Sequence, residues 1–179
     1  MTTVWLRAHN VLMVAILTVL AVGAMAAARN VSFVAPRQPI PLIWPVATIQ
    51  VAGLFLLLDT GFGAPLHAAV RGRLDRLLAV IALLALAGML IPASSFLGAP
   101  DVLRTWLVAV VAMGMISAAA GTGEPWAVAL VVGLLGIAAE FSTPIAPLSR
   151  LLAGPGPTVI AVTALVIGSA IYVKRTAVP

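Results

Sequence analysis

The sequence predicts an all-α integral membrane protein with six transmembrane helices. Of its 179 residues, 63% are hydrophobic and only 8% are charged, and the mean hydropathy is +1.19. About a quarter of the residues of a water-soluble domain are charged, so most of this chain must face lipid or neighbouring helices. Apolar runs alternate with short polar or proline-rich interruptions. Residues 1–179 are therefore predicted to form a single polytopic membrane domain.

Six apolar runs approach the length of about 20 residues that a membrane-spanning helix needs. The predicted spans are residues 11–28, 42–58, 77–93, 102–120, 126–139 and 158–173. Small residues fill the second half of the first run, which is typical of a helix that packs closely on another. A cleaved signal peptide is the alternative interpretation of this first run.

The connections between the runs carry the residues that interrupt or begin helices. Four prolines in residues 31–45 exclude a regular helix there and predict an extracytoplasmic connection. Pro92 is expected to stop the third helix, and Asp101 is expected to cap the fourth. Residues 140–157 remain partly apolar among several prolines. This pattern predicts a re-entrant or interfacial segment against protein or water.

The basic residues lie singly or in small groups at the ends of the apolar runs, where they mark topology. This distribution argues against a nucleic-acid partner, which would require cations clustered on a solvated face. Six spans place both termini on one side. If that side is cytoplasmic it holds Arg7, Arg71, Arg73, Arg76, Lys174 and Arg175, against Arg29, Arg37, Arg104 and Arg150 outside. The excess of positive charge predicts both termini in the cytoplasm of a bacterial inner-membrane protein.

Residues 58–76 form the longest polar interruption and are predicted to be a cytoplasmic loop. Pro65 suits the first turn of a short helix running to Arg76, with a basic amphipathic face at the membrane surface. We expect this face to dock a partner. The predicted docking residues are His67, Arg71, Arg73, Asp75 and Arg76. For His67, a simple interfacial role and a proton-linked role both remain open.

The sequence contains no pattern that predicts catalysis. There is no cysteine, nor any nucleophile and base pair, metal-ligand spacing or phosphate-binding GxxxxGK[ST] loop. The chain is therefore not expected to be an enzyme, and it predicts no cofactor, no metal site and no catalytic residue. Any ATP hydrolysis would belong to a partner subunit.

Two polar positions stand out in or beside the apolar runs. Glu140 follows the fifth run, where an ionised carboxylate is costly unless it is paired or hydrated, and Arg150 is its natural partner. With Phe141, this pair is predicted to form an external gate or to shape the re-entrant region, although Glu140 reaching headgroup water is an equal alternative. Gln50 is a mid-membrane polar residue that needs a partner outside its own helix.

This layout resembles the membrane-spanning permease subunits of ABC exporters of the drug-efflux and polysaccharide-export type, in the small form found in high-GC bacteria. The resemblance covers the whole chain: an interfacial start, six spans, a loop after the second span, a tight GTGEP turn and a basic C-terminus. It implies a coupling helix within residues 65–76 that contacts a separate ATP-binding subunit, and a re-entrant segment at residues 141–157. It also implies a second permease subunit, identical or homologous, and a path for an apolar or amphipathic cargo.

Two other classes of protein fit the same pattern. A ligand-binding membrane subunit of an energy-coupling-factor importer also has six helices in about this length, and predicts a tightly bound small ligand. A non-transporting scaffold or assembly subunit of a larger membrane complex fits the small-residue helix faces equally well. Membrane lipid is a partner in all three cases.

Overall fold

The computed structural model describes residues 11–27, 29–34, 39–58, 68–97, 100–121, 124–142, 152 and 155–174. Within them the fold is all-α, with six helices and one small hairpin of two strands. The helices are α2 (Val11–Ala27), α3 (Ile43–Leu54), α4 (Ala68–Phe96), α5 (Asp101–Ala120), α6 (Pro125–Ser142) and α8 (Pro155–Lys174). A 3₁₀ turn, η1 (Phe55–Leu57), continues α3.

Three of these helices are long and apolar enough to cross a membrane. They contain the segments Arg76–Ser94, Asp101–Ala120 and Pro155–Lys174. Three shorter apolar helices accompany them, at Leu12–Ala27, Ile43–Leu57 and Pro125–Phe141. The predicted all-α class is confirmed, and the apolar helices indicate a multi-pass membrane protein.

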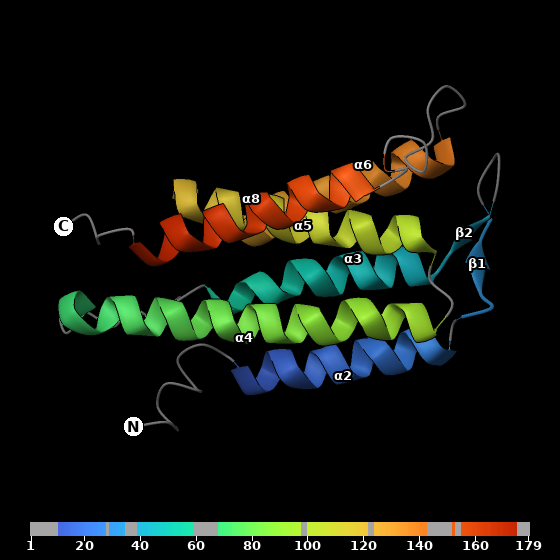
Figure 1. Cartoon of the computed structure of the whole chain (residues 1–179). Helices are drawn as coiled ribbons and strands as arrows, with labels where there is room; N and C mark the ends of the chain where they lie inside the picture. Colours follow the sequence, from blue (N-terminus) through green and yellow to red (C-terminus); the bar gives the residue numbers. More distant parts are fainter. Residues whose placement is uncertain are drawn as a thin grey trace.

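The helices run side by side and alternate in direction along the chain (Figure 1). α3 and α5 form the centre of the bundle: α3 packs on α2, α4, α5 and α6, and α5 packs on α3, α4, α6 and α8. The most extensive pairing joins α5 and α8, where Gly168 brings α8 against the backbone of α5 at Ile116. α2 starts and α8 ends at the same end of the bundle (Figure 1).

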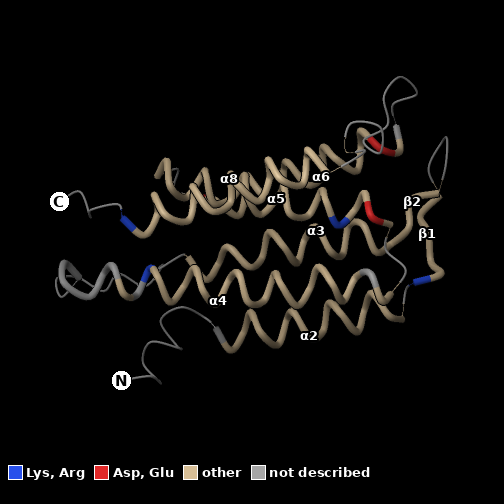
Figure 2. The backbone as a smooth tube through the Cα atoms, viewed as in Figure 1, with Lys and Arg blue, Asp and Glu red and all other residues tan. Residues whose placement is uncertain are grey.

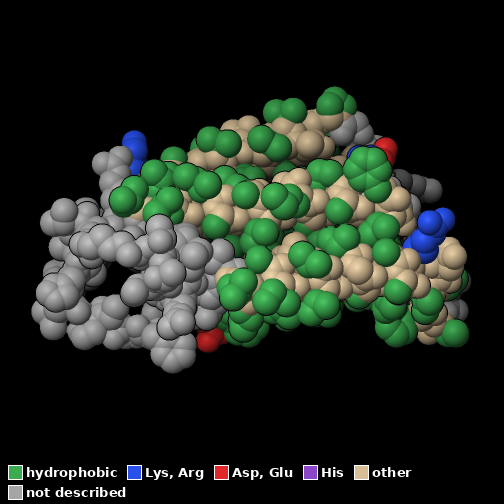
Figure 3. Space-filling view, turned by 90° about the horizontal axis from the view of Figure 1, so that it is seen from below, with side chains coloured by type: hydrophobic (Ala, Val, Ile, Leu, Met, Phe, Trp, Pro, Cys, Tyr) green, Lys and Arg blue, Asp and Glu red, His purple; other side chains and the backbone are tan. Residues whose placement is uncertain are grey.

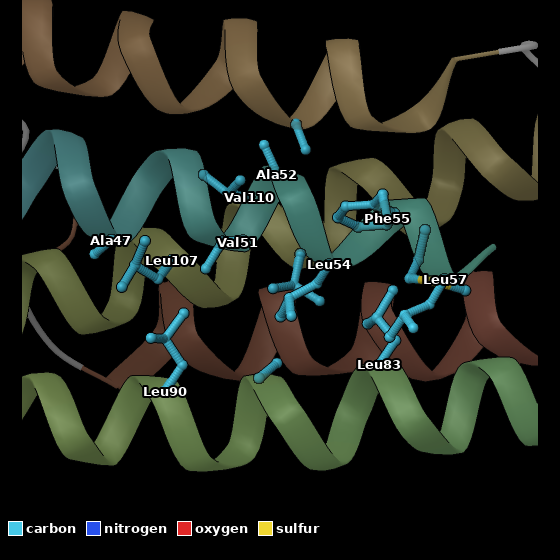
Figure 4. Packing of buried hydrophobic residues seen from close by; sticks show 14 of the residues in the cluster. Ala47, Val51, Ala52, Leu54, Phe55, Leu57, Leu83, Leu90, Leu107 and Val110 are labelled. Atoms are coloured by element: carbon cyan, nitrogen blue, oxygen red, sulfur yellow. The ribbon is translucent and has the colours of Figure 1, made fainter. Parts of the chain in front are cut away.

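The interior is a close-packed apolar core (Figure 4). Leu54, Phe55 and Leu57 at the end of α3 are fully buried, together with Leu83 of α4 and Leu107 of α5. The outer surfaces of the helices are also apolar, and green hydrophobic side chains cover much of the face drawn in Figure 3. Such an exterior is expected where lipid is the solvent.

Pro92 does not stop the third helix, contrary to the prediction, because α4 continues through it to Phe96. Proline removes one amide donor and its ring presses on the carbonyl of the residue four positions earlier, which here is Gly88. The hydroxyl of Ser94 donates to the Ile91 carbonyl at 2.6 Å, which adds a hydrogen bond beside the interruption. Membrane helices tolerate proline under such conditions.

The predicted cap at Asp101 is also wrong. The N-cap is Pro100 and Asp101 is the first residue of α5, where its carboxylate forms an ion pair with Arg104. At the other end of α5, Gly121 has a φ of 79° and its amide donates to the Ser117 and Ala118 carbonyls. This left-handed C-cap begins the predicted GTGEP turn, and α6 starts at Pro125.

The predicted re-entrant segment is shortened from both ends. α6 continues through Glu140 and Phe141 to Ser142, and α8 begins at Pro155 rather than after Pro157. Proline is favoured in the first turn of a helix, which explains why two prolines of this segment belong to α8. Residues 143–151 and 153–154 lie outside the described residues, so a re-entrant turn there stays a prediction.

A short β-hairpin, which the sequence did not predict, follows α2. β1 (Ser32–Phe33) pairs antiparallel with β2 (Ile40–Pro41), with Ser32 opposite Pro41 and Phe33 opposite Ile40. The amide of Leu42 donates to the Val31 carbonyl at 2.9 Å and closes the hairpin onto the start of α3. The prolines do exclude a helix here, as predicted, and they leave an extended pair in its place.

Candidate functional site

The predicted docking loop contributes the start of α4 instead of a separate helix. α4 has 29 residues, which corresponds to about 43 Å, whereas the hydrocarbon core is about 30 Å thick. The stretch Arg76–Ser94 of α4 is apolar and long enough to cross it. The excess length is about two turns, and the charges of Arg71, Arg73 and Asp75 place it at the start of α4. The separate amphipathic coupling helix predicted at residues 65–76 is wrong, because the chain from Ala68 onward has no break strong enough to end a helix.

The predicted docking residues fall into three groups. Arg71, Arg73 and Asp75 occupy the projecting turns of α4, although their side chains lie outside the described part of the structure. Arg76 follows them with a half-buried side chain. His67 lies outside the described residues. The start of α4 thus carries three arginines within the six residues 71–76 on one continuous helix.

The charges of the described residues gather at the two ends of the bundle (Figure 2). Arg76 lies at the end where α8 finishes on the exposed Lys174. Glu124, just before α6, belongs to this end as well, because α5 and α6 are joined there. This end therefore holds the start of α4, the finish of α8 and the α5–α6 turn.

The opposite end contains two of the residues predicted to form an external gate, Glu140 and Phe141. Glu140 is half-buried in the last turns of α6. The ring of Phe141 packs edge-on against the buried Trp44 of α3, with centroids 5.2 Å apart and planes at 87°. This aromatic pair holds the end of α6 on the start of α3. Arg150 lies outside the described residues, so its pairing with Glu140 stays a prediction.

Gln50 finds the partner outside its own helix that the sequence required. Its Nε2 donates to the Thr18 Oγ1 of α2 at 2.7 Å, and both side chains are buried. The Thr18 hydroxyl in turn donates to the Val14 carbonyl at 2.8 Å. Because that hydroxyl has a single proton, Gln50 must be the donor to it, which sets the orientation of its amide. The two hydrogen bonds join α2 to α3 inside the apolar interior.

Two glycines of α6 and one of α5 each receive a side chain of a neighbouring helix, and we call these contacts glycine notches. They were not predicted from the sequence. A Cβ on Gly133 would lie 2.2 Å from Thr48 Cγ2, and one on Gly136 would lie 2.0 Å from Trp106 Nε1. The Trp106 Nε1 also donates to the Gly133 carbonyl at 3.4 Å. α6 is thus seated on α3 and α5 through two glycines three residues apart. Their spacing was visible in the sequence, but nothing in it indicated which side chains they receive.

A third notch lies between α3 and α5. The Phe55 ring occupies the space where a Cβ on Gly114 would lie, and Phe55 is completely buried. Phe55 is the first residue of η1, so this contact fixes the end of α3 against the middle of α5. Tyr172 Oη donates to the Leu58 carbonyl at 3.4 Å and connects the same end to α8.

The described residues contain no group of three histidine, aspartate or glutamate side chains that could hold a metal ion. The start of α4 is predominantly basic, with Arg71, Arg73 and Arg76 beside a single acidic residue, Asp75. Comparison with known proteins adds no assignment: no known family matches the chain, and neither a curated protein nor a solved structure is significantly similar to it.

Proposed function

We propose that the chain is the six-span membrane subunit of an ATP-driven exporter in the bacterial inner membrane, with both termini in the cytoplasm. In this proposal the three shorter apolar helices cross the membrane together with the three long ones. A separate ATP-binding subunit docks on residues 59–76, and a second permease subunit, identical or homologous, completes the path.

The observation that carries this proposal is the projecting start of α4. At the end of the bundle that also holds Lys174, the start of α4 carries three arginines, and α4 is about two turns longer than the hydrocarbon core requires. A rigid helix that continues into the bundle is well suited to pass a displacement from a docked subunit to the membrane domain. A force on residues 71–76 would act directly along α4, which packs on α3, α5 and α8.

The interior supports a path between subunits in preference to one through this chain. The buried core of the described residues is apolar, and its buried polar members are Thr18, Thr48, Gln50, Ser94 and Ser117. A midplane site for an ion or a small polar ligand usually brings together charges or several amides. An apolar or amphipathic cargo that moves along the outer faces of the helices fits this composition better.

The test is to purify the tagged chain from its native membrane and identify the proteins that accompany it. The proposal expects an ATP-binding subunit in stoichiometric amount, and expects its loss when Arg71 and Arg73 are both replaced by glutamate. Lys174→Glu, at the same end but on α8, is the matched control for a general effect of charge. If the double reversal leaves the ATPase bound, the docking assignment is wrong.

A non-transporting scaffold is the second candidate, and the filled core favours it. The helices pack closely on one another at the glycine notches. A bundle packed in this way is suited to hold partner proteins in place without changing its own conformation. Recovery of a defined membrane complex that contains no nucleotide-binding chain would replace the exporter proposal with this one. A tightly bound small ligand in the purified chain would favour the importer alternative.

A further inference from the structure

The β1–β2 hairpin lies across one end of the helix bundle. In Figure 1 its strands run transverse to the helices, beyond the end of α2 and the start of α3. If the helices cross a bilayer, the hairpin lies roughly parallel to the membrane plane, at the depth of the lipid headgroups. Its position therefore differs from that of a loop that extends into water.

The hairpin exposes large apolar side chains at this position. Val31 is 50% exposed, Phe33 is 54% exposed and Val34 is completely exposed. Phe33 lies opposite Ile40, and directly paired residues point to the same face of a hairpin. Ile40 packs against the hydrophobic core. The face that bears Phe33 thus continues the apolar surface of the bundle, whereas Ser32 lies on the other face.

Lipid suits this surface better than a protein partner does. A stable protein interface buries about 800 Å² on each side. The three exposed side chains supply at most a few hundred Å², since a whole aromatic side chain buries roughly 150–250 Å². The exposed residues of α2 are apolar up to its end at Ala27, with large side chains from Leu12 to Leu20 and only glycine and alanine nearer the hairpin. Arg29, exposed between α2 and β1, supplies a cation at headgroup depth.

We propose that the β1–β2 hairpin is an interfacial membrane anchor that inserts Phe33 into the outer leaflet. Arg29 contacts the lipid phosphates beside it. The insertion fixes the depth and tilt of α2 and α3, which flank the hairpin. This inference rests on the six-span placement in the proposed function, and it is independent of coupling to an ATPase.

Fluorescence from single cysteines tests the anchor directly, because the natural chain contains no cysteine. The full-length variants Phe33→Cys, Ser32→Cys and Ile167→Cys are labelled with an environment-sensitive fluorophore and reconstituted in phosphatidylcholine–phosphatidylglycerol nanodiscs. Quenching is measured with water-soluble iodide, with lipids spin-labelled near the headgroup, and with lipids spin-labelled deep in the acyl chain. Ile167 is an exposed position of α8 and serves as the control for a lipid-facing helix.

The anchor predicts that the label at position 33 is quenched at least twofold more by the shallow spin label than by iodide, with the reverse order at position 32. Equal access of iodide to both positions would overturn the anchor. Protection of position 33 from iodide and from both lipid quenchers would also overturn it, since protein would then cover the hairpin. Quenching at position 167 by the deep label shows that the membrane placement holds even when the hairpin result is negative. If the deep label also fails to quench position 167, both the membrane placement and the hairpin anchor are refuted.

Discussion

The substitution Gly136→Ala tests whether α6 is seated on Trp106 as the structure indicates. The new Cβ would lie 2.0 Å from Trp106 Nε1 and 2.1 Å from Cε2, whereas ordinary contact begins at 3.4 Å. The rigid indole would have to move by more than an ångström, and its hydrogen bond to the Gly133 carbonyl would be lost. Overpacking of this kind costs about 1–3 kcal/mol.

The net effect also includes the intrinsic preference of a helix for alanine. Replacing glycine with alanine in a helix contributes up to about 1 kcal/mol of stability. Because the obstacle is a rigid ring, we take the upper end of the overpacking range and expect a net destabilisation of about 2 kcal/mol. Reversible unfolding of the detergent-solubilised chain in increasing SDS, followed by far-UV circular dichroism, measures this difference.

Gly88→Ala is the matched control, because no side chain and no backbone of another helix lies within 4 Å of the position that a Cβ on this residue of α4 would take, its two chain neighbours aside. We expect it to be neutral or stabilising. In a Trp106→Ala background, the step Gly136→Ala should cost little, since the obstacle has been removed. Equal stability of the Gly136→Ala and Gly88→Ala proteins would refute the packing of α6 on Trp106.

Three further experiments examine the interior and the surface. A double-mutant cycle of Thr18→Val and Gln50→Met should give a coupling energy of about 0.6 to 1.7 kcal/mol in SDS unfolding, and no coupling would mean that the buried hydrogen bond contributes nothing. Phe55→Ala should lower the free energy of unfolding by about 3–5 kcal/mol, because the ring is fully buried in the Gly114 notch; a loss below 1 kcal/mol would contradict that burial. Asp101→Asn should change stability by less than about 1 kcal/mol in the same assay, since the carboxylate in its pair with Arg104 is 87% exposed, and a larger loss would show that the pair is shielded from water.

The apolar helices could be predicted closely because hydropathy and length determine them. The first predicted span, residues 11–28, differs from α2 by one residue, and residues 42–58 contain α3 and η1. The polar position Gln50 was correctly expected to need a partner outside its helix. Its identity as Thr18 depends on how α2 rotates against α3, which the sequence of either helix alone does not specify.

The errors occurred where local signals compete with tertiary context. Pro92 is a strong helix breaker in isolation, yet α4 continues through it within the packed bundle. The polarity of residues 58–76 indicated a loop, whereas residues 68–76 continue α4, because a charged stretch with few helix breakers remains helical when it extends from a packed helix. The glycine notches were hidden for a further reason, since a glycine in a sequence does not reveal which ring or methyl group it receives.

The proposed function and the hairpin anchor both depend on the same topology. In it the chain crosses the membrane six times, with the start of α4 and the end of α8 on the cytoplasmic side. Single cysteines at Asn30, Phe96, Glu124 and Lys174, introduced one at a time, can be reacted in intact cells with a membrane-impermeant maleimide. Six crossings predict immediate labelling at positions 30 and 96, and labelling at positions 124 and 174 only after the membrane is permeabilised. Labelling of position 124 or 174 in intact cells, or protection of position 30 or 96, would contradict this topology.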